Sequence, residues 1–229
     1  NFRSCGAEMN RTARFYHSGE TSDLAIVLEH LGHTQPAIPL GVLGFSLGGN
    51  VLLKYLGEQG QGTLVRAAVA ISVPYDLAIC AREMSRGTPQ VYAKFFLRSL
   101  REKTRAKRKL LEGYCDVDRA LAARTVREFD EALTAPLHGF ADSAAYYQAS
   151  SAGPYLSGVR VPALLIHALD DPIVPAGSIP RDLIAANPML STAFTERGGH
   201  VGFITGTAPW SVRFWAEETG AGFLALHLR

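Results

Sequence analysis

The sequence predicts an α/β fold in which a mostly parallel sheet carries helices on both faces. Short apolar runs typical of buried strands alternate with helical patterns along much of the chain. A Gly-x-Ser-x-Gly motif lies between one such run and the next helical pattern, and the strand signal is absent from residues 84–156. Strands that alternate with helices indicate a parallel sheet covered on both faces. The chain has 229 residues, so we expect one large core with an insertion.

The first predicted elements are a helix, a strand and a second helix. Apolar residues recur at helical spacing over residues 23–31, after candidate capping residues. The run Gly41–Phe45 is short and apolar and lies between a proline and a pair of glycines, which is typical of a buried strand. Residues 51–56 return to a helical pattern. The Gly-x-Ser-x-Gly motif therefore falls in a strand-to-helix turn.

Three more strands and a final helix are predicted farther along the chain. Residues 65–73 are rich in Val, Ile and Ala and stop at a proline, and residues 161–167 and 192–196 have the same apolar character. Residues 210–226 are mostly helical in pattern, with an interruption at two glycines. These elements complete the predicted sheet and one of its covering layers.

A helical cap is expected between the two parts of the α/β core. Over residues 84–156 helical patterns replace the strand signal, and bulky apolar residues recur along them. The core would then consist of residues 1–83 and 157–229. The chain shows no low-complexity segment and no internal repeat at a period of about 20 to 50 residues.

Composition excludes several classes of protein. With 47% hydrophobic and 19% charged residues the chain is globular rather than disordered or fibrous. A net charge of +2 is too small to predict a nucleic-acid partner. The apolar stretches are far shorter than the about 20 residues of a transmembrane helix, and no signal peptide is expected. Three distant cysteines without ligand spacing predict reduced thiols, a cytoplasmic location and no metal site.

Ser46 is the candidate nucleophile. It stands in Gly44-Phe45-Ser46-Leu47-Gly48, where small flanking residues allow the sharp turn that projects a serine from the end of a strand. The alternative is a glycine-rich turn without catalytic meaning, because this pattern also occurs by chance. The backbone N–H of Leu47 would face an oxyanion that develops beside Ser46.

An acid and a base follow the next strands. Asp170 and Asp171 come directly after the strand over residues 161–167, so they lie at the same sheet edge as Ser46. Either aspartate could accept a hydrogen bond from an imidazole, with the other serving the turn. His200 stands in a glycine-rich loop after the following strand, which completes the chain order Ser, Asp, His of α/β-hydrolases. His200 would act as general base and the aspartate would orient it.

Three other features leave alternatives open. His167 either packs at a strand end or supports the acid. His17 either is structural or belongs to a loop like a His-Gly oxyanion loop. The basic residues of stretch 94–109 form either a solvated helix face or a peripheral contact with anionic lipid.

The chain resembles the YheT-like subfamily of α/β-hydrolases, relatives of proteins that act on phospholipid esters. The resemblance rests on stretches spread over nearly the whole chain: 1–3, 16–21, 44–56, 129–130, 134–140, 167–172 and 198–203. It implies Ser46, Asp171 and His200 as the charge-relay residues and favours Asp171 over Asp170. It also implies hydrolysis of carboxylic esters, including lipid-like or medium-chain acyl esters, without a cofactor.

The start of the chain departs from that family. Where the family has a segment with the glycine and the serine in exchanged positions, this chain has Ser4-Cys5-Gly6. Related hydrolases also have several strands and an oxyanion loop upstream of the segment that begins at Asn1. We therefore expect an amino-terminal truncation that lacks those strands and the second oxyanion donor. An exposed sheet edge would make such a chain poorly stable or prone to aggregate.

Two other functions are compatible with these residues. An acyltransferase would use the same three side chains and replace water by an alcohol or amine as acceptor. A catalytically silent binding protein is the second, because a fold does not guarantee a function.

Overall fold

The computed structural model describes residues 1–206 and 208–229, which form two compact units. Residues Asn1–His17 and Leu77–Ser150 make one unit, here called the helical unit. Residues Ser18–Asp76 and Ser151–Arg229 make the other, here called the α/β unit, and it contains every strand of the described residues. Helices occupy much of the predicted insertion, residues 84–156, and its role as a cap stays a prediction.

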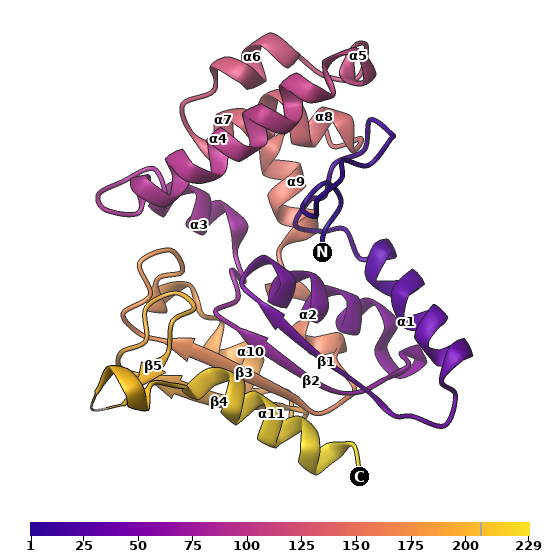
Figure 1. Cartoon of the computed structure of the whole chain (residues 1–229), viewed down its shortest axis with the longest axis vertical. Coiled ribbons are helices and arrows are strands. Elements are labelled where there is room, and N and C mark those ends of the chain that lie inside the picture. Colours follow the sequence, from indigo (N-terminus) through magenta and orange to yellow (C-terminus); the bar gives the residue numbers. More distant parts are fainter. Residues whose placement is uncertain (207) are drawn as a thin grey trace. The chain divides into compact units, whose positions relative to one another are not determined.

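A four-stranded parallel sheet forms the centre of the α/β unit (Figure 1). Its strands follow the order of the chain: β1 (Leu40–Phe45), β2 (Val65–Ile71), β3 (Ala163–Ala168) and β4 (Leu190–Thr195). Each strand lies within about two residues of the position that its apolar run predicted. The predicted α/β class, with its mostly parallel sheet, is confirmed.

Both faces of the central strands β2 and β3 are buried, which explains why these strands read as continuous apolar runs. Along β2, Ala68 and Ala70 point into one core, together with residues of α1 (Ser22–Thr34) and α2 (Leu47–Gln59). The alternate residues Val69 and Ile71 point into a second core, against α11 (Trp215–His227). Because successive side chains of a strand point to opposite faces of the sheet, β2 packs against both layers of helices.

Helix α2 is held in a close backbone contact at its carboxyl-terminal end. A Cβ atom on Gly57 would lie 2.2 Å from the carbonyl oxygen of Tyr155, and one on Gly158 would lie 2.3 Å from that of Gly57. Only glycine permits this approach between α2 and the short helix η3 (Gly153–Gly158). The contact fixes the helix that begins directly after Ser46.

The predicted final helix begins later than expected. Residues Pro209–Ser211 form a 3₁₀ turn (η5), and β6 (Arg213–Phe214) pairs antiparallel with β5 (Ile204–Thr205). The helical expectation was therefore wrong before Trp215, because pairing with β5 overrides the local apolar spacing. The expected glycine interruption was also wrong, since α11 runs unbroken to His227. Gly220 instead lets α11 approach the sheet, where a Cβ would meet Leu43 at 3.0 Å.

The helical unit consists of the long helix α4 and several short helices, packed around two apolar clusters. Its elements are α3 (Leu77–Glu83), α4 (Gln90–Ala106), α5 (Arg108–Leu111), α6 (Val117–Ala122), α7 (Val126–Phe129), η2 (Asp130–Thr134), α8 (Ala135–Leu137) and α9 (Ser143–Ser150). Buried Lys107 donates to Asn10 Oδ1 at 2.9 Å and to the carbonyl of Arg14 at 2.8 Å. These bonds tie the first residues of the chain to the end of α4.

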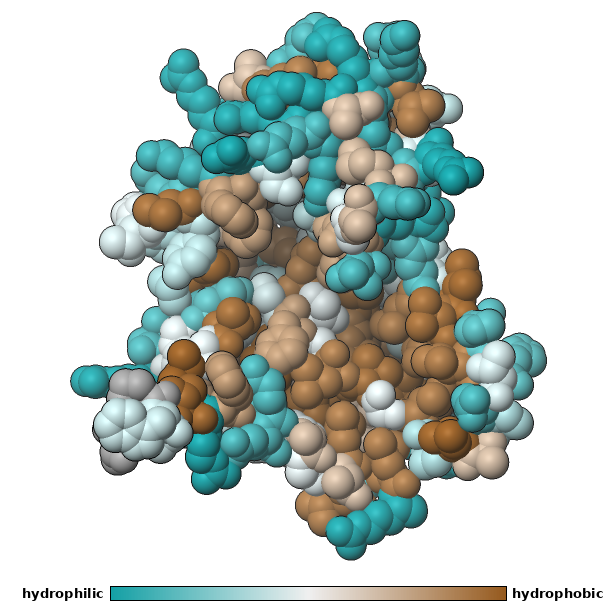
Figure 2. Space-filling view, viewed as in Figure 1, coloured by the Kyte–Doolittle hydropathy of each residue, from teal (hydrophilic) through white to brown (hydrophobic). Residues whose placement is uncertain are grey.

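One edge of the sheet is apolar. Among the described residues, β1 pairs with β2 and with no other strand. Figure 2 shows hydrophobic side chains gathered over β1, β2 and α11 on the face in view. That further strands precede Asn1, and that the chain is poorly stable without them, stays a prediction. In the part of the chain that the structure describes, no helix is both long and apolar enough to cross a bilayer.

Candidate active site

Ser46 occupies a strained turn between β1 and α2. Its backbone has φ +47° and ψ −116°, a region that residues with a Cβ rarely adopt. The N–H of Ser46 donates to the carbonyl of Ile71 on β2 at 2.7 Å, and the N–H of Asn50 donates to the carbonyl of Ser46 at 3.0 Å. Neighbouring strand and helix therefore hold the residue in this conformation.

The glycines beside Ser46 differ in their steric roles. A Cβ atom on Gly44 would lie 2.6 Å from the carbonyl oxygen of Gly48, and one on Gly49 would lie 2.8 Å from the side chain of Val73. A Cβ atom on Gly48 would have no heavy atom within 4 Å apart from its chain neighbours and the backbone of its own helix. The tight turn thus depends on Gly44 and Gly49, although the sequence motif marks Gly44 and Gly48.

Two adjacent aspartates after β3 have different partners. Asp171 is buried, and its Oδ1 accepts the N–H groups of Ile173 at 2.8 Å and Val174 at 3.0 Å. Its Oδ2 lies 2.8 Å from Nδ1 of His200. Asp170 instead accepts the N–H groups of Gly198 and Gly199, both at 2.9 Å. Asp171 therefore contacts the imidazole, and Asp170 holds the backbone that leads to it.

His200 lies between Asp171 and Ser46. Its Nε2 is 2.7 Å from Oγ of Ser46, and its Nδ1 faces Asp171. A neutral imidazole with its proton on Nδ1 donates to the carboxylate and accepts from the serine hydroxyl. Gly199 adopts φ +62° on the approach to the histidine, which favours glycine. The three side chains form one continuous chain of hydrogen bonds at the carboxyl edge of the sheet.

His167 supports the loop that carries Asp171. It is fully buried at the end of β3, and its Nε2 lies 3.1 Å from the carbonyl of Val174. Burial lowers the pKa of His167, so the ring is neutral near pH 7 and Nε2–H is the donor. It also packs edge-on against Phe194 of β4. His167 is therefore a packed strand-end histidine, and it orders the turn after Asp171 through this bond.

The N–H of Leu47 is available at the start of α2. Leu47 is the first residue of the helix, so its N–H has no acceptor within the helix. The positive end of the helix dipole lies at the same place. An oxyanion formed beside Ser46 would meet both. A second donor, expected upstream of Asn1, stays a prediction.

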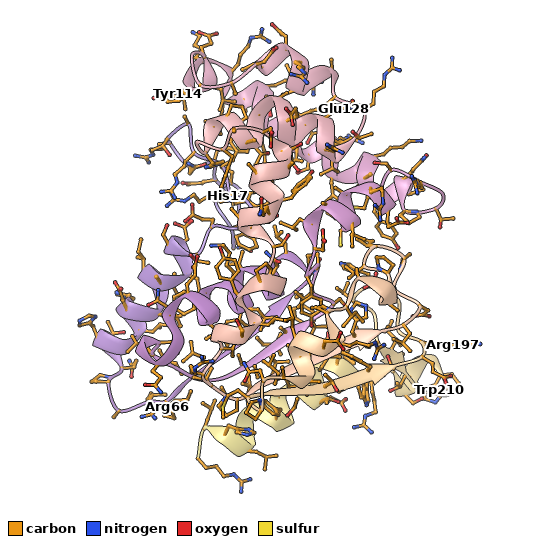
Figure 3. All side chains as sticks on the ribbon, turned by 180° about the vertical axis from the view of Figure 1, so that it is seen from behind. His17, Arg66, Tyr114, Glu128, Arg197 and Trp210 are labelled. Atoms are coloured by element: carbon orange, nitrogen blue, oxygen red, sulfur yellow. The ribbon has the colours of Figure 1, made fainter. Side chains whose placement is uncertain are left out.

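His17 lies in the helical unit within an aromatic cluster (Figure 3). Its ring is 4.3 Å from that of His138 and packs edge-on against Phe140 and Tyr146. These contacts favour the structural interpretation of His17. Among the residues that the structure describes, no group of three His, Cys, Asp or Glu side chains is placed to hold a metal ion.

Sequence reasoning missed a buried carboxyl in the helical unit. Asp130 lies at the start of η2, and Oη of Tyr147 donates to it at 2.8 Å. Burial raises the pKa of Asp130 from 3.8 to about 6, against the opposing effect of hydrogen bonds from Thr134 and Tyr147. The π-helical turn, which brings Asp130 inside, has no signature in the apolar spacing.

The comparison with known families agrees with this geometry. A model described as "alpha/beta hydrolase fold" matches residues 5–207. The chain belongs to the alpha/beta hydrolase fold family. It is 38% identical, over 99% of its length, to YheT of Escherichia coli (strain K12), whose name gives it as a candidate esterase. It is 30% identical, over 91% of its length, to the Homo sapiens protein named phospholipase ABHD3. The resemblance to YheT-like hydrolases is thus confirmed.

This alpha/beta hydrolase chain covers only part of those relatives. It spans 67% of the length of YheT and 51% of the length of the human phospholipase. A solved structure, the Pyrococcus furiosus esterase Pf2001, superposes with a TM-score of 0.58 at 17% identity. That match covers 100% of this chain and 70% of the esterase, and at this identity it supports the fold.

Proposed function

We propose that the chain is a serine hydrolase that cleaves carboxylic esters, with Ser46 as nucleophile, His200 as general base and Asp171 as the residue that orients the base. The observation that carries the proposal is the hydrogen-bond chain from Asp171 through His200 to Ser46, at 2.8 and 2.7 Å. The strained backbone at Ser46 supports it, because such strain is retained where the surrounding structure holds a functional residue in place.

In the proposed reaction, Nε2 of His200 takes the proton of the Ser46 hydroxyl as Oγ attacks the ester carbonyl. The carbonyl oxygen becomes an oxyanion, which the N–H of Leu47 stabilises. Collapse of the tetrahedral intermediate breaks the bond to the alcohol, and His200 returns its proton to the departing oxygen. Water then attacks the acyl-enzyme by the same route and releases the carboxylic acid. Asp171 stabilises the imidazolium in both halves.

The substrate class proposed is a small-molecule or lipid ester. One relative is named as a candidate esterase and another as a phospholipase, which supports acyl esters with a lipid-like chain. Hydrolysis of this class needs no cofactor in the mechanism above. A cytoplasmic location remains part of the same proposal.

Steady-state hydrolysis of p-nitrophenyl acyl esters of increasing chain length tests this function. Ser46→Ala should lower kcat by about a millionfold, since the members of such a triad act as one unit. Ser157→Ala is the matched control, because Ser157 is an exposed serine of the same α/β unit. Turnover that survives in Ser46→Ala contradicts the proposal. Transfer of the acyl group to an added alcohol at the expense of hydrolysis identifies an acyltransferase instead.

A further inference from the structure

Helix α4 presents an apolar face away from the core of the helical unit. Val91 and Phe95 are 70% and 73% exposed, and Tyr92 and Phe96 are 47% and 43% exposed. Each pair is spaced i, i+4, so the four side chains form two adjacent rows on one helix face. Ala93 and Leu97, on the opposite side, are buried in the unit. The exposed rows are therefore not required for its packing.

A contiguous group of this kind indicates an interaction surface. Single exposed apolar residues are normal on soluble proteins, whereas a cluster bordered by polar residues marks a binding site for a protein or a membrane. Figure 2 shows hydrophobic side chains at the amino-terminal end of α4 and hydrophilic ones farther along it. The apolar group thus has a polar border on its own helix.

That border is strongly basic. Residues 94–109 contain eight Lys or Arg and a single acidic residue, Glu102, whereas the whole chain has a net charge of only +2. Lys94, Arg98 and Arg105 lie along one side of the helix, at offsets of four and eleven residues. The excess of positive charge is therefore local and adjoins the apolar rows.

Several of these cations have no acidic partner. Arg98 pairs with Glu102 at 3.1 Å, and Arg108 pairs with Asp118 at 2.8 Å. Lys94, Arg105 and Lys109 are exposed and form no ion pair with any residue among 1–206 and 208–229. These three charges are available to an external anion.

We propose that the outward face of α4 binds the surface of an anionic lipid bilayer. Val91, Phe95 and their neighbours would enter the boundary between headgroups and acyl chains, and the cations would meet lipid phosphates and carboxylates. A convex helix with protruding side chains suits a bilayer, which needs no groove complementary to it. An acidic protein partner or a nucleic acid would leave Phe95 and Val91 without a specific pocket. The inference is independent of the proposed ester hydrolysis.

Co-sedimentation of the full chain with vesicles tests the proposal. Two compositions are compared: phosphatidylcholine alone, and phosphatidylcholine with about one third phosphatidylserine. The chain should bind the anionic vesicles at least about tenfold more strongly, and salt should weaken the binding. Equal binding to both compositions, or no binding to either, overturns the proposal.

Two double variants separate the apolar and the charged contributions. Val91→Ser with Phe95→Ser should lower the vesicle partition coefficient by about tenfold or more. Lys94→Glu with Arg105→Glu should lower it by a similar factor on anionic vesicles. The controls are Tyr114→Ser, at a residue that is 61% exposed and lies off the face, and Arg66→Glu in the α/β unit (both labelled in Figure 3). Phe95→Ala is the milder variant if the double change impairs folding.

Other occupants give distinct results. If the apolar face contacts a second copy of the chain, sedimentation velocity reports self-association that Val91→Ser with Phe95→Ser abolishes, while vesicle binding is absent. If the face contacts the ester, the same variant loses turnover of a soluble short-chain ester and keeps its vesicle binding. Preferential binding of RNA or an acidic protein without vesicle binding points to those partners. Each of these results overturns the bilayer proposal.

Discussion

The buried carboxyl groups of the α/β unit and of the helical unit differ in the groups that donate hydrogen bonds to them. Asp171 receives two backbone N–H groups and the imidazole of His200. Asp130 lies among helices, where burial raises its pKa to about 6 although Tyr147 donates to it. A carboxylate at the end of a parallel strand meets the free N–H groups of the following turn, whereas helices use their own N–H groups internally. The proposed chemistry accordingly uses the carboxylate that lies beyond the carboxyl end of β3.

The basic side chains of the two units also differ in what they contact. His167 and His200 both form hydrogen bonds that order the loops around Asp171. In the helical unit, Lys107 holds the amino-terminal segment, and the remaining cations of residues 94–109 are mostly at the surface. Changes to the hydrogen-bond partners of Asp171 should therefore affect turnover first, and changes in the helical unit should affect stability or binding.

The largest expected effect after loss of Ser46 concerns the two aspartates. Asp171→Asn should lower kcat by about 10⁴-fold, because an amide that donates to Nδ1 stabilises the wrong tautomer of His200. Asp170→Asn keeps an oxygen that accepts from Gly198 and Gly199, so kcat should fall by about tenfold or less. Measurement of kcat for ester hydrolysis as a function of pH tests both variants. Equal losses would mean that the two carboxylates share one role.

A smaller effect is expected at the turn before Ser46. Gly44→Ala forces a Cβ against the backbone of Gly48, so the free energy of unfolding should fall by about 2 to 4 kcal/mol. Gly48→Ala is the matched control. It meets open space within α2, so it should change the free energy by less than about 1 kcal/mol, towards greater stability. Urea titration followed by circular dichroism distinguishes the two, and similar losses would contradict the assigned geometry.

In the helical unit, replacement of Asp130 is expected to change stability in a way that depends on pH and to leave ester turnover unchanged. The pKa of Asp130 is raised, so the folded state retains a proton that the unfolded chain releases above about pH 4. Wild-type stability should fall, relative to Asp130→Asn, by about 2 kcal/mol as pH rises from about 4 to about 6. Urea titrations at the two ends of this range measure the difference.

Glu131 is the control of opposite sign. Hydrogen bonding by Ser143, through its side chain and its backbone, lowers the pKa of Glu131, and the N–H of Ser143 lies 2.8 Å from the carboxylate. Glu131→Gln should therefore lose stability relative to the wild type at neutral pH rather than at acid pH.

For Asp130, a stability difference between the wild type and Asp130→Asn that stays constant from about pH 4 to about pH 6 would contradict the raised pKa.

Local patterns predicted the strands, and with them Ser46, His200 and a pair of aspartates at the sheet edge, whereas the choice of Asp171 over Asp170 came from the family resemblance. Ser46, Asp171 and His200 each follow a strand, and parallel strands bring their carboxyl ends together. The patterns could not predict that Asp170 binds the backbone of Gly198, 28 residues away, or that Gly48 meets no neighbour. Such contacts depend on how loops from different strands meet in space. The late start of α11 has a similar cause, since β6 pairs with β5.

Labelling with a fluorophosphonate probe, mapped by mass spectrometry, tests the central claim most directly. The probe reacts with serines that are activated as nucleophiles, so it reports on Ser46 without knowledge of the natural ester. We predict a single adduct on Ser46 in the folded chain, reduced strongly in Asp171→Asn and absent in Ser46→Ala. A folded chain that takes no label, or a label that persists on another serine in Ser46→Ala, would contradict the account.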